Sequence, residues 1–116
     1  MNIQVGKLNK KVIKLLSLEY KKEIPITLGD SNIEHMKRQH PNDYEKYGHD
    51  IKKIISSPTY VAKNPKQDSI EYIKEYKRDN EFVLVAVRVS NKGNLFTMTD
   101  RKKNIYLSKG YAKKYK

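Results

Sequence analysis

The chain has no cysteine among its 116 residues, which excludes disulfide bonds and zinc sites that are built on thiolates. It also lacks a long apolar run. The best one, FVLVAV at 82–87, is far shorter than the roughly 20 residues that a membrane-spanning helix needs, and Lys14 interrupts the apolar stretch near the N-terminus. We therefore expect a soluble, cytoplasmic protein without a membrane segment, folded as one domain over residues 1–116.

Acidic residues are scarce, since 13 Asp and Glu stand against 25 Lys and Arg and leave a formal net charge of +12. A positive balance of this size indicates a polyanionic partner such as RNA, or contact with an anionic membrane. The apolar stripe of residues 9–19 is short and better suited to a protein core than to a membrane surface. RNA is therefore the partner that we expect.

Half of the net charge lies near the C-terminus, where seven Lys and Arg accompany one Asp from residue 100 to residue 116. We predict that residues 101–116 form a basic C-terminal tail that holds RNA, with Arg101, Lys102 and Lys103 among its contacts. The alternative is a solvated run of terminal charges with no ligand.

The first half of the chain favours helices. Asn9 is a good N-cap for the apolar periodicity that follows it, and this pattern predicts a helix over about 9–19. The stretch SNIE begins with Ser31 and fits a capping box, so a second helix is expected from there to residue 39 or 40, ahead of a proline. A stripe of isoleucines predicts a third helix over about 49–57.

The rest of the chain favours strands. EIPITLGD, TYVA and LFTMT each predict an extended segment, and SIEYIKEYK, which also fits a helix, is assigned to a strand. EFVLVAVRV at 81–89 is apolar on both faces, which suits a strand inside a sheet, and turn residues in KNPKQD and SNKGN separate the strands. This order predicts an α+β domain with N-terminal helices packed on one face of a four- to five-stranded antiparallel sheet. The other face is then free for a ligand.

The hairpin around SNKGN can bring three polar residues together. A three-residue turn pairs Arg88 with Phe96, whereas a four-residue turn pairs Arg88 with Leu95 and places Arg88, Thr97 and Thr99 on one face. The sequence is compatible with both registers. Without a ligand, Arg88 would be a solubilising charge near the strand end, and the two threonines would be ordinary strand residues.

All three histidines, His35, His40 and His49, lie in one short segment, DSNIEHMKRQHPNDYEKYGHD at 30–50. A metal site is a poor fit, because His35 and His40 lie about 140° apart around a helix and no HExxH pattern is present. A local structural role is open to His40, since a protonated imidazole at the end of a helix meets the negative end of the helix dipole.

Acid–base chemistry is the third interpretation of His35 and His40. Two imidazoles that titrate near neutral pH can take the proton of a ribose 2′-hydroxyl and protonate the leaving 5′-oxygen, while a cation stabilises the phosphorane. This reaction needs no metal and no cofactor. Lys37 and Arg38 are expected to contact phosphates, and Tyr60 is expected to stack on a base, although such rings also serve as edges of a core.

A family resemblance supports the catalytic interpretation. The stretches ITLGDSNIEHMKRQHP, IISSPTYVAKNP, FVLVAVRV and LFTMT, in this order, resemble the phage-associated branch of the barnase, EndoU, colicin and RelE-like nucleases over about residues 24–106. The resemblance implies helices on a four- or five-stranded antiparallel sheet and metal-independent ribonuclease activity in phage or mobile elements, sometimes as a toxin. On the matching motifs, His35 and His40 correspond to catalytic positions, Arg88 to the strand cation, and Thr97 or Thr99 to the hydroxyl on the last strand.

We therefore predict a metal-independent endoribonuclease that cleaves RNA through a histidine acid–base pair and acts as a phage or mobile-element toxin or effector. An acidic inhibitor protein is a candidate second partner. The alternative is a basic module without catalytic activity, which binds nucleic acid or an acidic protein. Both hypotheses predict that binding weakens steeply with salt, because neutralised phosphates release counterions in either case.

Overall fold

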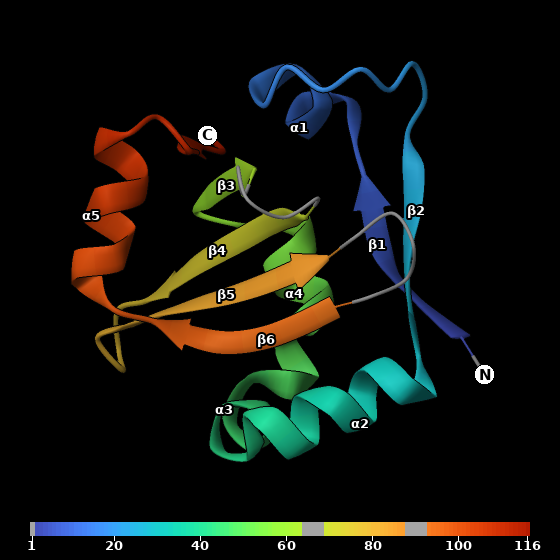
Figure 1. The fold of residues 1–116 in the computed structure, drawn as a ribbon, viewed down its shortest axis with the longest axis vertical. Helices are drawn as coiled ribbons and strands as arrows, with labels where there is room; N and C mark the ends of the chain where they lie inside the picture. The colour runs from blue at the N-terminus through green and yellow to red at the C-terminus, as the bar shows by residue number, and fades with distance from the viewer. Residues whose placement is uncertain (1, 64–68, 88–92) are drawn as a thin grey trace.

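The structure is a computed structural model that describes residues 2–63, 69–87 and 93–116 (Figure 1). For six of these residues it describes the backbone alone: Asn2, Gly93, Asn94, Phe96, Thr97 and Asp100. In chain order the elements are β1 (Asn2–Leu8), α1 (Lys10–Leu15), β2 (Ile24–Gly29), α2 (Asp30–Gln39), α3 (Pro41–Tyr47), the 3₁₀ helix η1 (Gly48–Asp50), α4 (Ile51–Ser56), β3 (Tyr60–Lys63), β4 (Ile70–Tyr76), β5 (Glu81–Val87), β6 (Gly93–Met98), α5 (Asp100–Ser108) and β7 (Ala112–Lys114).

The strands form two antiparallel sheets. Within the described residues, five strands pair in the order β6-β5-β4-β3-β7, and β1 pairs with β2 in a separate sheet. The predicted α+β class with an antiparallel sheet is therefore confirmed. SIEYIKEYK forms β4 as predicted, and β5 lies inside the sheet between β4 and β6, as its apolar residues on both faces indicate.

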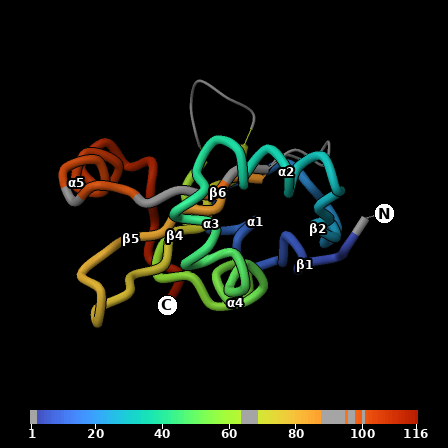
Figure 2. The backbone as a smooth tube through the Cα atoms, turned by 90° about the horizontal axis from the view of Figure 1, so that it is seen from below, coloured from blue at the N-terminus to red at the C-terminus, as the bar shows by residue number. Residues whose placement is uncertain are grey.

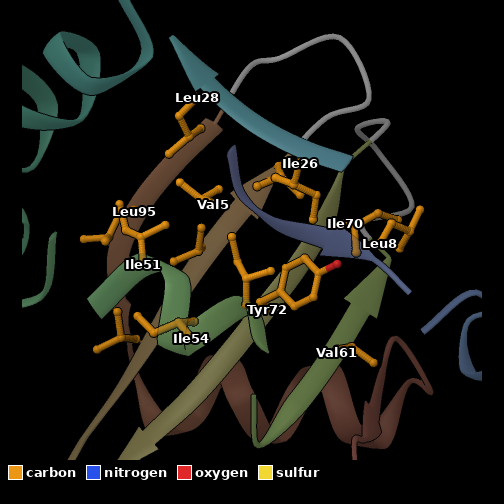
Figure 3. Close-up of a cluster of buried hydrophobic side chains, with 14 of the residues drawn as sticks. Val5, Leu8, Ile26, Leu28, Ile51, Ile54, Val61, Ile70, Tyr72 and Leu95 are labelled. Atoms are coloured by element: carbon orange, nitrogen blue, oxygen red, sulfur yellow. The ribbon is translucent and has the colours of Figure 1, made fainter. Parts of the chain in front are cut away.

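One face of the larger sheet packs against α4 and the β1–β2 sheet. Ile51, Ile54 and Ile55 of α4 are at most 5% exposed, because spacings of three and four residues place them on one side of the helix. They join Val5 of β1 and Tyr72 of β4 in one apolar cluster (Figure 3). This cluster fixes the position of α4, whose C-terminal end forms part of the site described below.

The opposite face is covered by α5, which corrects the expectation that it is free for a ligand. Tyr106 of α5 packs with Leu84 of β5 and Ile73 of β4 in a second apolar cluster, so that α4 and α5 lie on opposite sides of the sheet (Figure 2). The hydroxyl of Tyr106 also hydrogen-bonds with the buried carboxylate of Glu71. Helices therefore pack on both faces.

Residues 101–116 are part of the fold and not a separate tail. Residues 100–108 form α5, and β7 pairs antiparallel with β3. Tyr106 and Ala112 are buried in this segment, while Lys113 and Lys114 are exposed. The high lysine content conceals the few apolar side chains that hold the segment on the sheet, which is why composition alone suggests a tail.

The cap of α1 follows the prediction, but the helix ends early. Oδ1 of Asn9 accepts a hydrogen bond from the N–H of Val12 at 2.9 Å, as expected for an N-cap. The helix ends at Leu15 and not near residue 19, because Ser17 has a left-handed φ of 52° that interrupts helical geometry.

The start of α2 differs from the predicted capping box. The N–H of Gly29 donates to Oδ1 of Asn32 at 3.0 Å, so the helix begins at Asp30 and Ser31 is not its N-cap. Its end at Gln39 agrees with the prediction. The helix α3, which the sequence reasoning did not identify, starts immediately afterwards with a proline at its first position, where the missing N–H costs nothing.

The pairing of β5 with β6 differs from both expected registers. Leu95 pairs with Val85 and Phe96 with Leu84, whereas the two expected registers pair Leu95 or Phe96 with Arg88. Arg88 itself lies outside the described residues. Thr97 is paired through its Cα with Val83.

Gly6 of β1 lies so close to α4 that a methyl group at this position would be 2.6 Å from Cγ2 of Ile55. Ile55 is 2% exposed and β-branched, so it has little room to move. We predict that Gly6→Ala lowers the free energy of unfolding by about 1–3 kcal/mol, which a chemical denaturation curve would measure.

The same substitution in an Ile55→Ala background serves as the control. The clashing methyl is absent there, so Gly6→Ala should cost much less than in the parent chain. Equal costs in the two backgrounds would show that the loss does not come from this contact.

Candidate nucleic-acid interface

A cleft of about 680 Å³ opens at the end of the large sheet, where β4 ends and β3 begins. Three segments that are far apart in the sequence form its walls: the end of α4 with the turn into β3, the end of β4 with the turn that follows, and the end of β7. The cleft therefore exists only in the folded chain.

The turn from α4 to β3 is fixed by proline and by hydrogen bonds to β4. α4 stops at Ser56, ahead of the buried Pro58, because a residue that precedes proline is pushed out of the helical conformation. The N–H of Thr59 donates to the carbonyl of Ile73 at 2.8 Å, and its Oγ1 accepts from the N–H of Glu75 at 3.0 Å. These bonds hold two walls of the cleft at a fixed separation.

Positive charge dominates the cleft. Of its described lining residues, six are cationic and two are carboxylates. The cations are Lys53, Lys74, Lys77, Arg78, Lys114 and Lys116. Cations gathered in a concave surface focus the electrostatic potential, which attracts an anionic ligand.

Lys74 is the most constrained of these cations. Its Nζ donates a hydrogen bond to the carbonyl oxygen of Ser57 at 2.8 Å, which holds the ammonium inside the cleft. Burial lowers the pKa of Lys74 below its ordinary value, repulsion from Lys53 and Lys116 lowers it further, and Asp50 acts in the opposite direction. The site thus holds like charges close together.

One of the two carboxylates is engaged by groups that do not line the cleft. The hydroxyl of Tyr47 lies 3.1 Å from Oδ2 of Asp79 and also hydrogen-bonds with Glu81, and Nζ of Lys46 lies 3.7 Å from Oδ1 of Asp79. Burial and these two carboxylates raise the pKa of Tyr47, so its hydroxyl keeps its proton and donates. Asp79 is therefore less able to neutralise the cations of the cleft.

Two tyrosines line the cleft. Tyr60, predicted to contact RNA, lies there half-buried at the start of β3. The hydroxyl of Tyr76 donates to Oδ2 of Asp50 at 2.9 Å. The centre of the Tyr76 ring lies 4.7 Å from the centre of the Tyr47 ring. Burial and the bond to Asp50 raise the pKa of Tyr76, which therefore remains protonated.

The three histidines lie elsewhere, and none is among the described lining residues of the cleft. His35 is exposed on α2, and His40 joins α2 to α3, with its N–H donating to the carbonyl of Met36 at 2.9 Å. The bond to Met36 is made by the backbone N–H of His40, so the helix-end role expected for its imidazole stays a prediction. His49 in η1 places Nε2 3.5 Å from Oδ1 of Asp50, the residue that also binds Tyr76.

The predicted strand residues are not brought together by the described part of the structure. Thr97 is in β6, but its side chain is outside the description, as is the whole of Arg88. Thr99 follows β6 and is the N-cap of α5, where its Oγ1 accepts from the N–H of Lys102 at 3.1 Å. The hydroxyl of Thr99 therefore has a local structural use.

The other predicted RNA contacts lie on helix surfaces. Lys37 and Arg38 are exposed on α2, and Nζ of Lys37 lies 5.5 Å from the centre of the Tyr44 ring. Arg101 is exposed on α5. Nζ of Lys102 lies 5.7 Å from the centre of the Tyr106 ring, and Nζ of Lys103 lies 4.6 Å from the centre of the Phe82 ring. Such cation–π contacts stabilise the helix surface whether or not RNA is bound.

Most of the cleft was missed by reasoning from the sequence. A local signal did exist in the segment YIKEYKRD, which mixes cations with aromatic residues at 72–79. Its partners, Lys53 and Lys116, lie in segments whose spatial relation depends on the pairing of β7 with β3. No spacing rule along the chain predicts that pairing.

The described residues include neither a metal-binding cluster nor a membrane-spanning helix. In residues 2–63, 69–87 and 93–116, no three or more His, Asp or Glu side chains are grouped so that they could hold a metal ion. Likewise, the described part of the chain includes no helix with the length and apolarity required to cross a membrane.

The described residues therefore combine an antiparallel α+β fold with a cleft whose lining is mostly cationic. Residues 3–109 match the family model of the phage-Barnase-EndoU-ColicinE5/D-RelE like nuclease3 family. The chain belongs to this phage-related nuclease family, in agreement with the resemblance noted in the sequence. At the level of significance that we required, no curated protein and no solved structure matches it.

Thr99 allows a test between a capping and a catalytic hydroxyl. We predict that Thr99→Ala lowers the free energy of unfolding by about 1 kcal/mol, because an N-cap hydrogen bond is lost, and that Thr99→Ser restores most of it. Thermal and chemical denaturation would measure both. Loss of nuclease activity in Thr99→Ala, measured per folded molecule, would instead assign the hydroxyl to catalysis.

Proposed function

We propose that this protein is an endoribonuclease that binds RNA through the basic cleft and cleaves it without a metal ion. The observation that carries the proposal is the cleft itself, whose described lining includes six cations and two carboxylates, in a chain of a nuclease family. A phosphodiester backbone supplies the regularly spaced negative charge that such a surface binds.

The proposed chemistry is attack by the ribose 2′-hydroxyl on the adjacent phosphate. A general base takes the proton of the 2′-hydroxyl, the bond from phosphorus to the 5′-oxygen breaks, and a general acid protonates that oxygen. His35 on α2 and His40 at its C-terminal cap are the proposed pair, on the motif match, although neither is among the described lining residues of the cleft. The products are a 2′,3′-cyclic phosphate and a free 5′-hydroxyl, with no net proton change.

A phage or mobile-element setting supports a role as a toxin or effector in the cytoplasm, since the family is phage-related. A nuclease made inside its own host requires restraint. An acidic inhibitor protein that fills the basic cleft would supply it, because its carboxylates would satisfy the same cations as phosphates do.

The second candidate function is a basic module that binds nucleic acid or an acidic protein without cleaving it. One observation favours it, namely that no histidine lines the cleft among the residues described there. Under this hypothesis the cleft keeps its salt-dependent affinity, but His35 and His40 have only local roles.

Cleavage of RNA in the presence of EDTA separates the two functions. We expect fragments that end in 2′,3′-cyclic phosphate, while DNA of the same sequence survives because it lacks the attacking hydroxyl. Phosphate-end analysis of the fragments by mass spectrometry would identify the products. An RNA pool that stays intact in both EDTA and magnesium would favour the binding module.

Single substitutions assign the acid and the base. His35→Ala and His40→Ala should each reduce cleavage by about 10² to 10⁴-fold, the usual contribution of a positioned acid or base, and leave RNA affinity nearly unchanged. His49→Ala is the matched comparison, because His49 approaches Asp50 and hence Tyr76 of the cleft. Loss of activity in His49→Ala alone would move the acid–base function from α2 to η1.

A further inference from the structure

We propose that Lys53, Lys74 and Lys116 form a subsite for one phosphate of a single-stranded RNA, held inside the cleft with Lys74 at its centre. The inference rests on the proposed function for the identity of the polymer.

The position of the Lys74 ammonium is fixed before any ligand arrives. It lies half-buried in β4 and donates to the carbonyl of Ser57 at 2.8 Å, across the cleft wall at the end of α4. An ammonium has three N–H donors, so this single bond leaves two for a ligand. A preorganised donor of this kind loses little side-chain entropy when it binds phosphate.

The surroundings of Lys74 favour an anion over an empty site. Lys53 from α4 and Lys116 beyond β7 both act on Lys74 by charge repulsion, while Asp50 opposes them. Asp50 accepts a hydrogen bond from the hydroxyl of Tyr76, and its Oδ1 lies 3.5 Å from Nε2 of His49. A phosphate between the three lysines would relieve the repulsion, and this relief adds to the binding free energy.

The size of the cleft selects an unpaired strand. About 680 Å³ falls within the range of roughly 300–1,000 Å³ that encloses a ligand of nucleotide size. A single strand can bend one phosphate into such a cleft and place a base against the ring of Tyr60. A duplex keeps its phosphates on a stiff convex surface and its bases stacked inside, so it can touch the rim but not fill the subsite.

Binding is measured with a single-stranded 2′-O-methyl RNA, which retains every phosphate but has no free 2′-hydroxyl for attack. Fluorescence anisotropy with the full chain gives the affinity independently of cleavage. Lys74→Gln should weaken binding on the order of 10-fold or more, because a charge-assisted hydrogen bond to phosphate is lost. Lys53→Gln should weaken binding as well, and Lys74→Arg should retain more affinity than Lys74→Gln.

Lys52→Gln is the matched control for Lys53→Gln. Lys52 is the neighbouring residue on α4, carries the same charge and is exposed, but does not line the cleft. Its substitution should change affinity by no more than about 2-fold, as expected for a general electrostatic effect. Equal losses in the two variants would overturn the subsite and leave only a diffuse positive surface.

The Lys74 resonance gives a second readout that does not depend on folding of a variant. Phosphate binding should raise the pKa of the Lys74 ammonium, and a ¹³Cε titration of the parent chain with and without the 2′-O-methyl strand would detect the shift. An unchanged pKa in the complex would place the strand outside the subsite. A duplex of the same sequence that binds as tightly as the single strand would overturn the strand selectivity.

The subsite and the proposed nuclease function can fail separately. If Lys74→Gln and Lys53→Gln lose affinity while the parent leaves every RNA intact, the subsite stands and the ribonuclease proposal fails. If the parent cleaves RNA and both variants bind and cleave as the parent does, the subsite is wrong and the active site lies elsewhere.

Discussion

The burial of three isoleucines on one short helix holds this structure together. α4 is only six residues long, too short to be stable alone, and it forms because Ile51, Ile54 and Ile55 pack between the β1–β2 sheet and the larger sheet. The close approach at Gly6 shows how tightly β1 contacts this helix. Since the end of α4 supplies Lys53 and the Ser57 carbonyl, apolar packing in the core determines the geometry of a polar surface site.

The chain also distributes its few carboxylates in a consistent way. Three of its tyrosines donate their hydroxyls to acidic residues: Tyr47 to Asp79 and Glu81, Tyr76 to Asp50, and Tyr106 to Glu71. A neutral hydroxyl satisfies a carboxylate without consuming a cation. In the cleft, six cations and two carboxylates are among the described lining residues, so its charge is mainly positive.

Local signals in the sequence predicted the parts of the fold that depend on neighbouring residues. The Asn9 cap, the end of α2 before a proline and the strand EFVLVAV each rest on a few adjacent positions, and each is confirmed. β1 was not predicted, because NIQVGKL is short and interrupted by glycine, and its pairing with β2 spans a helix. The β5–β6 register was wrong because both expected registers assumed a turn of three or four residues, whereas the last pair, Val87 with Gly93, leaves five residues between the strands.

The candidate site was predicted less completely than the fold. Tyr60 was identified from its basic and aromatic surroundings, but the lysines of the cleft come from three separate segments and look like ordinary solvated charges in the sequence. The segment taken for a tail illustrates the difficulty. Tyr106 and Ala112 hold it on the sheet through burial that only tertiary structure provides. Sequence pattern therefore indicates an anionic partner and leaves the location of binding to the structure.

The position of β7 at the edge of the sheet has a consequence for biosynthesis. Translation proceeds from the N-terminus, so β7 is made after every strand with which it shares the sheet, and Lys114 and Lys116 of the cleft are made with or after it. A nascent chain that lacks them has a cleft with one wall missing. While the ribosome is still elongating through these residues, the growing protein cannot present the completed cleft to the messenger from which it is being read.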